Sequence, residues 1–325
     1  MRKGTLFFLI TLGLYSFQSQ AQWVESGNLK NVTWEYSFTG SGTVNNPNEG
    51  IEKASTPTKE NFLAKPSSGE VKVIGTEEKG KGRASFTLNN NALTMVHTSG
   101  RGFQAAPAKF VAKDFAAKSK VMSAHFNLTP NSTAENFQAV WYIIVGEGGN
   151  VNVSGVNAPA ISKYLKTDNG VYTLLRFRKG AAGRPYVLQA RHNSGDKVKW
   201  GWKTLPGSTL ADGSKAKIDL FFNNTDNPQS YTFKGLERTL PAASYHVYID
   251  GNQKGADLAT ELIRNVATPG NNAFRYTGNL NGFSIMSREG ANATEFESDG
   301  KTRVKDNSAS ITIDDLKIVH LVGAK

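Results

Sequence analysis

Short runs in which apolar and polar residues alternate extend along almost the whole chain. Side chains of a β-strand point alternately to its two faces, so each run predicts a strand with one buried face. Clusters of Gly, Asn, Asp and Pro separate the runs, a pattern typical of an all-β protein. The expected strands are residues 32–38, 71–75, 83–88, 92–97, 120–128, 137–147, 171–178, 185–191, 197–203, 217–223, 245–250, 282–288 and 310–321.

The sequence contains few signals for structure other than strands. Residues 256–265 and 158–166 are candidates for a few short helices. Residues 39–70 contain few large apolar side chains and are interpreted as a long surface excursion, with a linker between two domains as the alternative. Because the one strand before this segment cannot form a domain, we expect a single β-sandwich domain over residues 22–325.

The N-terminus has the three parts of a secretory signal: a positive start (Arg2, Lys3), an apolar stretch (6–17) and a small-x-small tripeptide that ends at Ala21. This predicts a signal peptide over residues 1–21. The apolar stretch is shorter than the about 20 residues of a membrane span, although an uncleaved anchor is the alternative. The chain has no cysteine. An exported chain without cysteine favours a bacterial protein that is periplasmic, cell-surface or extracellular.

The charge of the chain is strongly positive. The formal net charge is +11, and loss of Arg2 and Lys3 with the signal would leave +9. A basic exported protein suits acidic polymers such as uronic-acid or sulfated glycans. The charges are dispersed, so a basic surface that only aids solubility is the alternative. We expect a monomer that binds polysaccharide, without a nucleic-acid partner or a membrane span.

Several expected strands have one apolar face and a second face with arginine, glutamine and aromatic side chains. Aromatic rings stack on the C–H groups of sugars, and the planar arginine fork binds carboxylate or sulfate. An ordinary solvated sheet face is the alternative. The candidate ligand-binding residues on these faces are Tyr172, Arg176, Arg178, Gln189 and Arg191. In KVKWGWK, residues 197–203, Trp200 and Trp202 share a face, and we expect at least one of them in the core.

Three segments in the C-terminal half resemble the concanavalin A-like (laminin-G-like) jelly roll. They are AKIDLFFNNTDNPQSYTF (216–233), SYHVYIDGNQKG (244–255) and ITIDDLKIVHL (311–321). The resemblance covers roughly residues 120–321. It implies two antiparallel sheets, with ligands on the concave one, in a family of lectins, carbohydrate-binding modules, glycoside hydrolases and polysaccharide lyases. The fold by itself does not choose among these functions.

The catalytic motifs of this family do not match the chain. No strand has the Glu-x-Asp-x-x-Glu pattern that gives retaining glycosidases their two close carboxyls. Alginate-lyase-like members have an Arg-x-Glu-x-Arg strand, whereas Arg176-Phe177-Arg178 contains no glutamate. Where a Gln-Ile-His strand would fall, residues 140–144 read VWYII. A known lyase constellation is therefore in doubt.

A divergent enzyme is the second hypothesis, and within it a lyase is favoured over a hydrolase. β-Elimination needs a group that neutralises the uronate carboxylate and a His or Tyr that takes the proton. His125, His246 and Tyr248 are the candidate catalytic residues. No cofactor is required. The resemblance suggests a structural Ca²⁺, for which Asp314 and Asp315 are the candidate ligands.

Three functions therefore remain: a glycan-binding protein for an acidic polysaccharide, a lyase or hydrolase on the same face, and a structural or adhesion sandwich. Convergence of His125, His246, Tyr248 and the arginines in one groove favours the enzyme. A shallow site with an accessible tryptophan and no titrating cluster favours binding. A flat sheet covered by residues 39–70 favours the structural role.

Overall fold

Strands make up nearly all regular structure in the part of the chain that the computed structural model describes. This part comprises residues 21–45, 62–75, 84–98, 108–114, 117–132, 139–148, 171–179, 184–193, 200–255, 257–259, 278–288 and 308–323. The strands are β1 (Gln22–Trp23), β2 (Leu29–Tyr36), β3 (Gly42–Asn45), β4 (Glu70–Gly75), β5 (Ala84–Asn89), β6 (Ala92–Thr98), β7 (Ala108–Lys113), β8 (Val121–Ser132), β9 (Val140–Gly146), β10 (Val171–Lys179), β11 (Tyr186–Asn193), β12 (Trp200–Leu210), β13 (Ala216–Asn223), β14 (Gln229–Phe233), β15 (Leu236–Leu240), β16 (Ser244–Ile249), β17 (Asn252–Gln253), β18 (Leu258–Ala259), β19 (Gly282–Arg288) and β20 (Ser308–Gly323).

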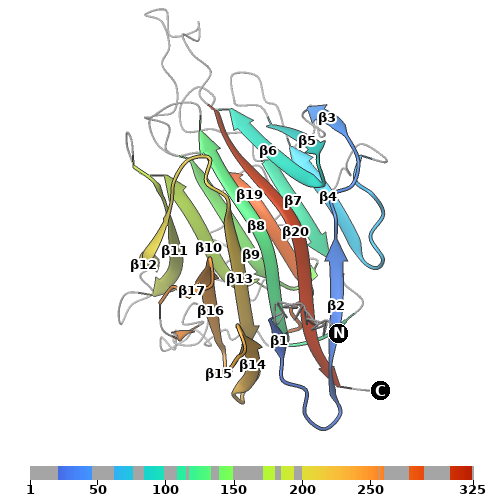
Figure 1. The fold of residues 1–325 in the computed structure, drawn as a ribbon, viewed down its shortest axis with the longest axis vertical. Coiled ribbons are helices and arrows are strands. Elements are labelled where there is room, and N and C mark those ends of the chain that lie inside the picture. The colour runs from blue at the N-terminus through green and yellow to red at the C-terminus, as the bar shows by residue number, and fades with distance from the viewer. Residues whose placement is uncertain are drawn as a thin grey trace, which may run out of the picture.

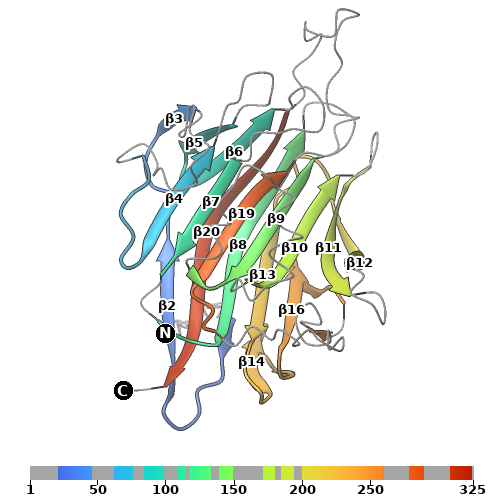
Figure 2. The ribbon, with the colours of Figure 1, turned by 180° about the vertical axis from the view of Figure 1, so that it is seen from behind.

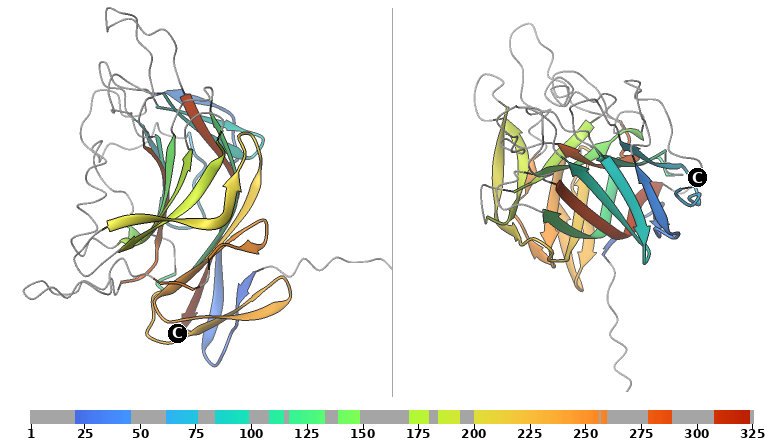
Figure 3. Two further views of the ribbon diagram at one scale, coloured as in Figure 1. Left: turned by 90° about the vertical axis from the view of Figure 1, so that its left-hand side faces the viewer. Right: turned by 90° about the horizontal axis from the view of Figure 1, so that it is seen from above.

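Two large antiparallel sheets lie face to face, as Figures 1 and 2 show from opposite sides. The ten-stranded sheet has the order β17-β16-β13-β8-β20-β6-β5-β3, with β18 beside β16 and β2 beside β20. The seven-stranded sheet has the order β12-β11-β10-β9-β19-β7-β4. Figure 3 shows the two layers from the side. This is the all-β, two-sheet antiparallel jelly roll that the sequence predicts.

The two sheets share one apolar core. On β8, Ala124 and Phe126 point between the sheets, as Trp141 and Ile143 do on β9 of the other sheet. Phe126 meets Phe283 of β19 edge to face, with ring centroids 5.5 Å apart. Full burial of a side chain such as Phe126, Ile143 or Phe283 stabilises the fold by roughly 1.5–3 kcal/mol. Residues that alternate with this core lie on the outer faces of the sandwich.

A small third sheet, β1-β14-β15, covers one end of the outer face of the ten-stranded sheet. Phe221 of β13 stacks on Tyr231 of β14, with ring centroids 3.9 Å apart. Trp23 of β1 meets Phe221 edge to face at 5.7 Å. Aromatic side chains therefore cover the outer face of the ten-stranded sheet at this end and keep water away from it.

The last strand, β20, lies in the middle of the ten-stranded sheet. It pairs with β8 along one side, while on the other side β6 pairs with its first half and β2 with its second half. Its register against β8 shifts between Asp314 and Lys317, and Asp315 has a φ of 53°. Such a β-bulge changes the direction of the side chains around it.

Some expectations about minor elements differ from the structure. Residues 258–259, expected in a short helix, form β18, which pairs with β16. The other candidate helix, residues 158–166, lies outside the described residues. The expected excursion over 39–70 contains the edge strand β3, which pairs with β5. Over the described ranges, no helix is long and apolar enough to cross a membrane.

Two buried histidines predict an acid-sensitive fold. Burial lowers the pKa of His97, which packs against Trp141, to about 3, and that of His320 to about 4. Both pKa values lie below the unfolded value of about 6.5, so acidification protonates the unfolded chain first. The free energy of unfolding therefore has its full value above about pH 6.5 and falls as the pH drops toward these two pKa values.

We expect the free energy of unfolding to fall by about 2 kcal/mol per histidine between about pH 7 and pH 5. Urea unfolding at several pH values measures this slope. Replacement of His97 by Phe removes one titrating group from the core, so H97F should lose about half of the slope that the two histidines cause. An H97F protein with an unchanged slope would contradict this assignment.

Candidate functional site

Basic and aromatic side chains gather on the outer face of β10, β11 and β12 in the seven-stranded sheet. Arg176 of β10 lies opposite Gln189 of β11, and Arg191 of β11 lies opposite Trp202 of β12. Side chains directly opposite each other in an antiparallel pair are close enough to touch. We call this group, together with Tyr142 of the neighbouring strand β9, the arginine–tryptophan site.

The ring of Trp202 contacts both arginines of the site. The guanidinium carbon of Arg176 lies 3.9 Å from the centroid of the Trp202 ring, and that of Arg191 lies 5.2 Å from it. The Tyr142 ring packs beside Trp202 at 5.7 Å. Each cation–π contact contributes roughly 0.5–2 kcal/mol, depending on how far it is removed from water. The two positive groups are therefore positioned before any ligand arrives.

A row of hydrogen bonds across the strands fixes the same groups. Arg176 Nε donates to Gln189 Oε1 at 2.8 Å, and Gln189 Nε2 donates to Thr204 Oγ1 at 2.9 Å. Arg176, Gln189, Arg191 and Trp202 are all partly exposed, and Arg178 is exposed. The site is thus ordered and still reachable from solvent.

The electrostatics of the site favour an anion. Burial lowers the pKa of Arg176, the nearby Arg178 and Arg191 lower it further, and the Tyr142 hydroxyl acts in the opposite direction. Arginine stays protonated in spite of such shifts. Within the described ranges, no ion pair joins Arg176 or Arg178 to a carboxylate. Among the described residues, positive side chains thus predominate at this face, and positive charge attracts negatively charged ligands.

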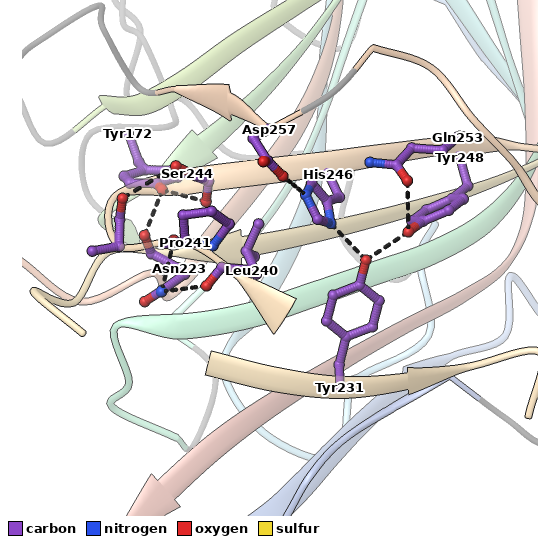
Figure 4. Close-up of polar contacts among 11 residues, drawn as sticks. Tyr172, Asn223, Tyr231, Leu240, Pro241, Ser244, His246, Tyr248, Gln253 and Asp257 are labelled. Carbon is purple, nitrogen blue, oxygen red and sulfur yellow. Dashed lines mark hydrogen bonds and ion pairs between the residues drawn. The ribbon is translucent and has the colours of Figure 1, made fainter. Parts of the chain in front are cut away.

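Tyr172 does not belong to this face, although the alternation of residues places it there. The register of β10 against β9 shifts between Val171 and Thr173, and this bulge turns Tyr172 into the core. Its hydroxyl lies 2.8 Å from the carbonyl oxygen of Asn223 and 2.9 Å from that of Ser244, both in the other sheet (Figure 4). Tyr172 therefore ties the two sheets together and does not face a ligand.

The candidate catalytic residues lie on the opposite side of the sandwich from the arginines. His125 is on β8, and His246 and Tyr248 are on β16, all on the outer face of the ten-stranded sheet. Arg176 is on the outer face of the seven-stranded sheet, with the shared core between the two groups. These three residues and the arginines therefore do not converge in one groove, which is the arrangement that would favour an enzyme.

His246 and Tyr248 belong to a buried network under the small sheet (Figure 4). His246 Nε2 lies 2.6 Å from Asp257 Oδ1, and His246 Nδ1 lies 2.6 Å from the Tyr231 hydroxyl. The Tyr248 hydroxyl lies 2.6 Å from that of Tyr231. Burial lowers the pKa of His246, with Asp257 acting in the opposite direction, and raises the pKa of Tyr231 and Tyr248.

These contacts assign the protons of the network. Because a carboxylate only accepts hydrogen bonds, Nε2 of the neutral His246 carries the proton toward Asp257, and Nδ1 accepts from Tyr231. Tyr231 and Tyr248 are fully buried. The network thus fastens the β14–β15 hairpin to β16, and its exposed member is Asp257, whereas His246 is buried.

His125 has a different setting, at the edge of the small sheet. Its Nδ1 lies 2.8 Å from Asp219 Oδ1 of β13, and its Nε2 lies 2.9 Å from Ser123 Oγ of β8. His125 and Asp219 line a pocket on the outer face of the ten-stranded sheet. The sequence interpretation missed Asp219, although it alternates with core residues of β13 and so was open to the same face analysis.

The candidate calcium ligands are brought together by the bulge in β20. Asn127 Nδ2 lies 2.6 Å from Asp314 Oδ1 and 2.9 Å from Asp315 Oδ2. Lys215 Nζ lies 3.0 Å from Asp314 Oδ2. The carboxylates of Asp314 and Asp315 thus lie close together on one face of the sheet. The Asn127 amide already binds both, and the Lys215 ammonium group binds Asp314. In the part of the chain that the structure describes, no group of three acidic or histidine side chains can hold a metal ion, and the calcium site stays a prediction.

Comparisons with known proteins concern the fold. No family model and no curated protein matches the chain. The carbohydrate recognition domain of Emp47p is 11% identical over 81% of this chain and 92% of that one, with a TM-score of 0.39. An endo-1,3-β-glucanase from Streptomyces sioyaensis is 12% identical (72% and 77% covered, TM-score 0.37), and alginate lyase A1-II', of polysaccharide lyase family 7, is 9% identical (72% and 82% covered, TM-score 0.38).

All three neighbours are less than 25% identical to the chain, with TM-scores below 0.5. At such identities and TM-scores, they do not decide what this chain binds or whether it catalyses a reaction.

The buried network predicts the effect of a single hydroxyl. Tyr231→Phe removes the hydroxyl between His246 and Tyr248, so each of these two buried side chains loses a hydrogen-bond partner. We expect the free energy of unfolding to fall by about 1–3 kcal/mol in urea titrations. Leu236→Ala, at the 60% exposed tip of the same hairpin, should change it little. Equal stability of Y231F and the wild type would mean that the network does not anchor the hairpin.

Proposed function

We propose that this chain is a glycan-binding protein that acts outside the cytoplasm and binds an acidic polysaccharide at the arginine–tryptophan site. The observation that supports this proposal most directly is the contact of Trp202 with two guanidinium groups, those of Arg176 and Arg191. Planar guanidinium groups bind carboxylate and sulfate with two parallel hydrogen bonds. Groups that are already ordered lose little entropy when the ligand binds.

The local chemistry favours an anionic ligand over a neutral one. Arg176 and Arg178 carry positive charge without a carboxylate partner among the described residues. Gln189 and the exposed Thr204 lie beside them and supply neutral hydrogen-bonding groups for sugar hydroxyls. The net charge of +11 adds a long-range attraction for a polyanion.

Binding is favoured over cleavage by the position of the three candidate catalytic residues, and Tyr142 is the titratable group that the site itself places beside Arg176. Elimination on a uronate requires a proton acceptor next to the group that neutralises the carboxylate. His125, His246 and Tyr248 lie beyond the shared core from Arg176, so they cannot act on a ligand held there. The structural role depends on a flat sheet covered by residues 39–70, of which residues 46–61 lie outside the described ranges.

Arginine substitutions test the binding site. In affinity gel electrophoresis with alginate, pectate, hyaluronan, chondroitin sulfate and heparin, we expect the wild type to be retarded by at least one polymer. R176Q and R191Q should each weaken that binding about tenfold, because each loses a charge-assisted hydrogen bond. Lys30→Gln, which removes one positive charge from an exposed site on β2, is the matched control and should bind as the wild type does.

The same experiment separates the alternatives. Retardation that R176Q, R191Q and K30Q weaken equally would mean that net charge alone causes binding. No retardation by any acidic polymer would contradict the proposal. Appearance of unsaturated uronate or of reducing ends during incubation would identify an enzyme.

A further inference from the structure

A polar pocket lies on the outer face of the ten-stranded sheet, opposite the arginine–tryptophan site, where the small sheet ends. It has a volume of about 360 Å³, toward the lower end of the roughly 300–1,000 Å³ typical of small-molecule sites. Its lining combines carboxylate, ammonium, amide and imidazole groups from β8, β13 and β20. The lining residues are His125, Phe126, Asn127, Lys217, Asp219, Asp315 and Lys317, together with Ala21, which cleavage of the predicted signal peptide would remove.

The strand register arranges these groups in two rows. In the first row, Asp219 of β13 lies opposite His125 of β8, which lies opposite Lys317 of β20. In the second row, Lys217 lies opposite Asn127. Neighbouring strands are about 4.8 Å apart, and successive residues on one face are about 6.7 Å apart. The outer strands of the pocket are therefore about 10 Å apart.

The bulge in β20 completes the second row. Asn127 lies opposite Asp314, and the left-handed backbone at Asp315 brings that second carboxylate to the same amide. Each outer strand of the pocket thus carries one acid and one ammonium group, in opposite order. Positive and negative groups alternate around the pocket, with Asn127 and His125 in the middle.

The middle of the pocket is held in place by hydrogen bonds. His125 lies between Asp219 Oδ1 at 2.8 Å and Ser123 Oγ at 2.9 Å. Asn127 Nδ2 is within 2.6 Å of Asp314 and 2.9 Å of Asp315. A ligand therefore meets an ordered surface and orders few side chains when it binds.

Ser123, His125 and Asp219 have the spacing of a catalytic triad, but they do not form one. A nucleophilic serine must reach the substrate. Ser123 is fully buried and does not line the pocket, and both ring nitrogens of His125 are occupied. This pocket is therefore suited to binding and not to acyl transfer.

We propose that the pocket binds a single neutral pyranose unit of a glycan. A ligand with a large charge of either sign would meet like-charged groups at two corners. A sugar hydroxyl both donates and accepts, so hydroxyls around a ring can pair in turn with Lys217, Asp219, Lys317 and Asp315. The pocket lies on the opposite outer face from the arginine–tryptophan site, and this inference does not rest on the proposed function.

NMR titration of the isotopically labelled protein with methyl glycosides of glucose, galactose and mannose tests the proposal. We expect at least one of them to shift the side-chain amide signals of Asn127 and the backbone signals of β8, β13 and β20. Lys217→Met should weaken this binding about tenfold, because it removes an exposed ammonium donor without touching the core. Lys30→Met is the matched control and should leave it unchanged.

Asp315→Asn provides a second variant that preserves the fold. Asparagine tolerates the left-handed backbone at this position, so only the carboxylate acceptor is lost. D315N should also weaken methyl glycoside binding, whereas R176Q should not. Binding of a free amino acid in place of every glycoside, or no shift in the pocket with any glycoside, would overturn the proposal, whatever happens with acidic polymers.

Discussion

The inward side chains of two sheets form a single apolar layer, and this layer sets the position of every polar group described above. Alternation along each strand sends every second residue into the layer and its neighbours to an outer face. Arg176 faces outward because Leu175 and Phe177 are in the core, and His125 faces outward because Ala124 and Phe126 are. The two groups are therefore separated by the thickness of the sandwich, which prevents them from acting on one ligand.

Regular alternation is interrupted at two places among the candidate residues. A bulge in β10 directs Tyr172 to a bridge between the sheets. Another, in β20, brings Asp314 and Asp315 to the same amide of Asn127 and forms one wall of the pocket. In both strands, one extra residue adds a polar contact that an unbroken strand does not make. Two irregular positions in a regular frame thus supply contacts that alternation alone would not give.

Sequence patterns predicted the sandwich and the outward direction of Arg176, Arg178, Gln189 and Arg191, because these depend only on local alternation. Tyr172 was misplaced because Val171 and Thr173 are ordinary strand residues, and nothing in their identity marks a bulge. The direction of His125, His246 and Tyr248 on their own strands was also predictable. The sheet to which each strand belongs was not, since it depends on pairing between residues far apart in the sequence, such as Asp219 with His125.

The central place of β20 has a consequence for how the chain becomes a folded protein. β8, β6 and β2 all use this strand as a partner, yet all three lie in the first half of the chain and are synthesised long before it. Until it arrives, the edges of those three strands have no neighbour there, and the large sheet cannot close. Such non-local pairing makes folding slow. The nascent chain therefore cannot complete its large sheet until β20 is synthesised, long after the three strands that pair with it.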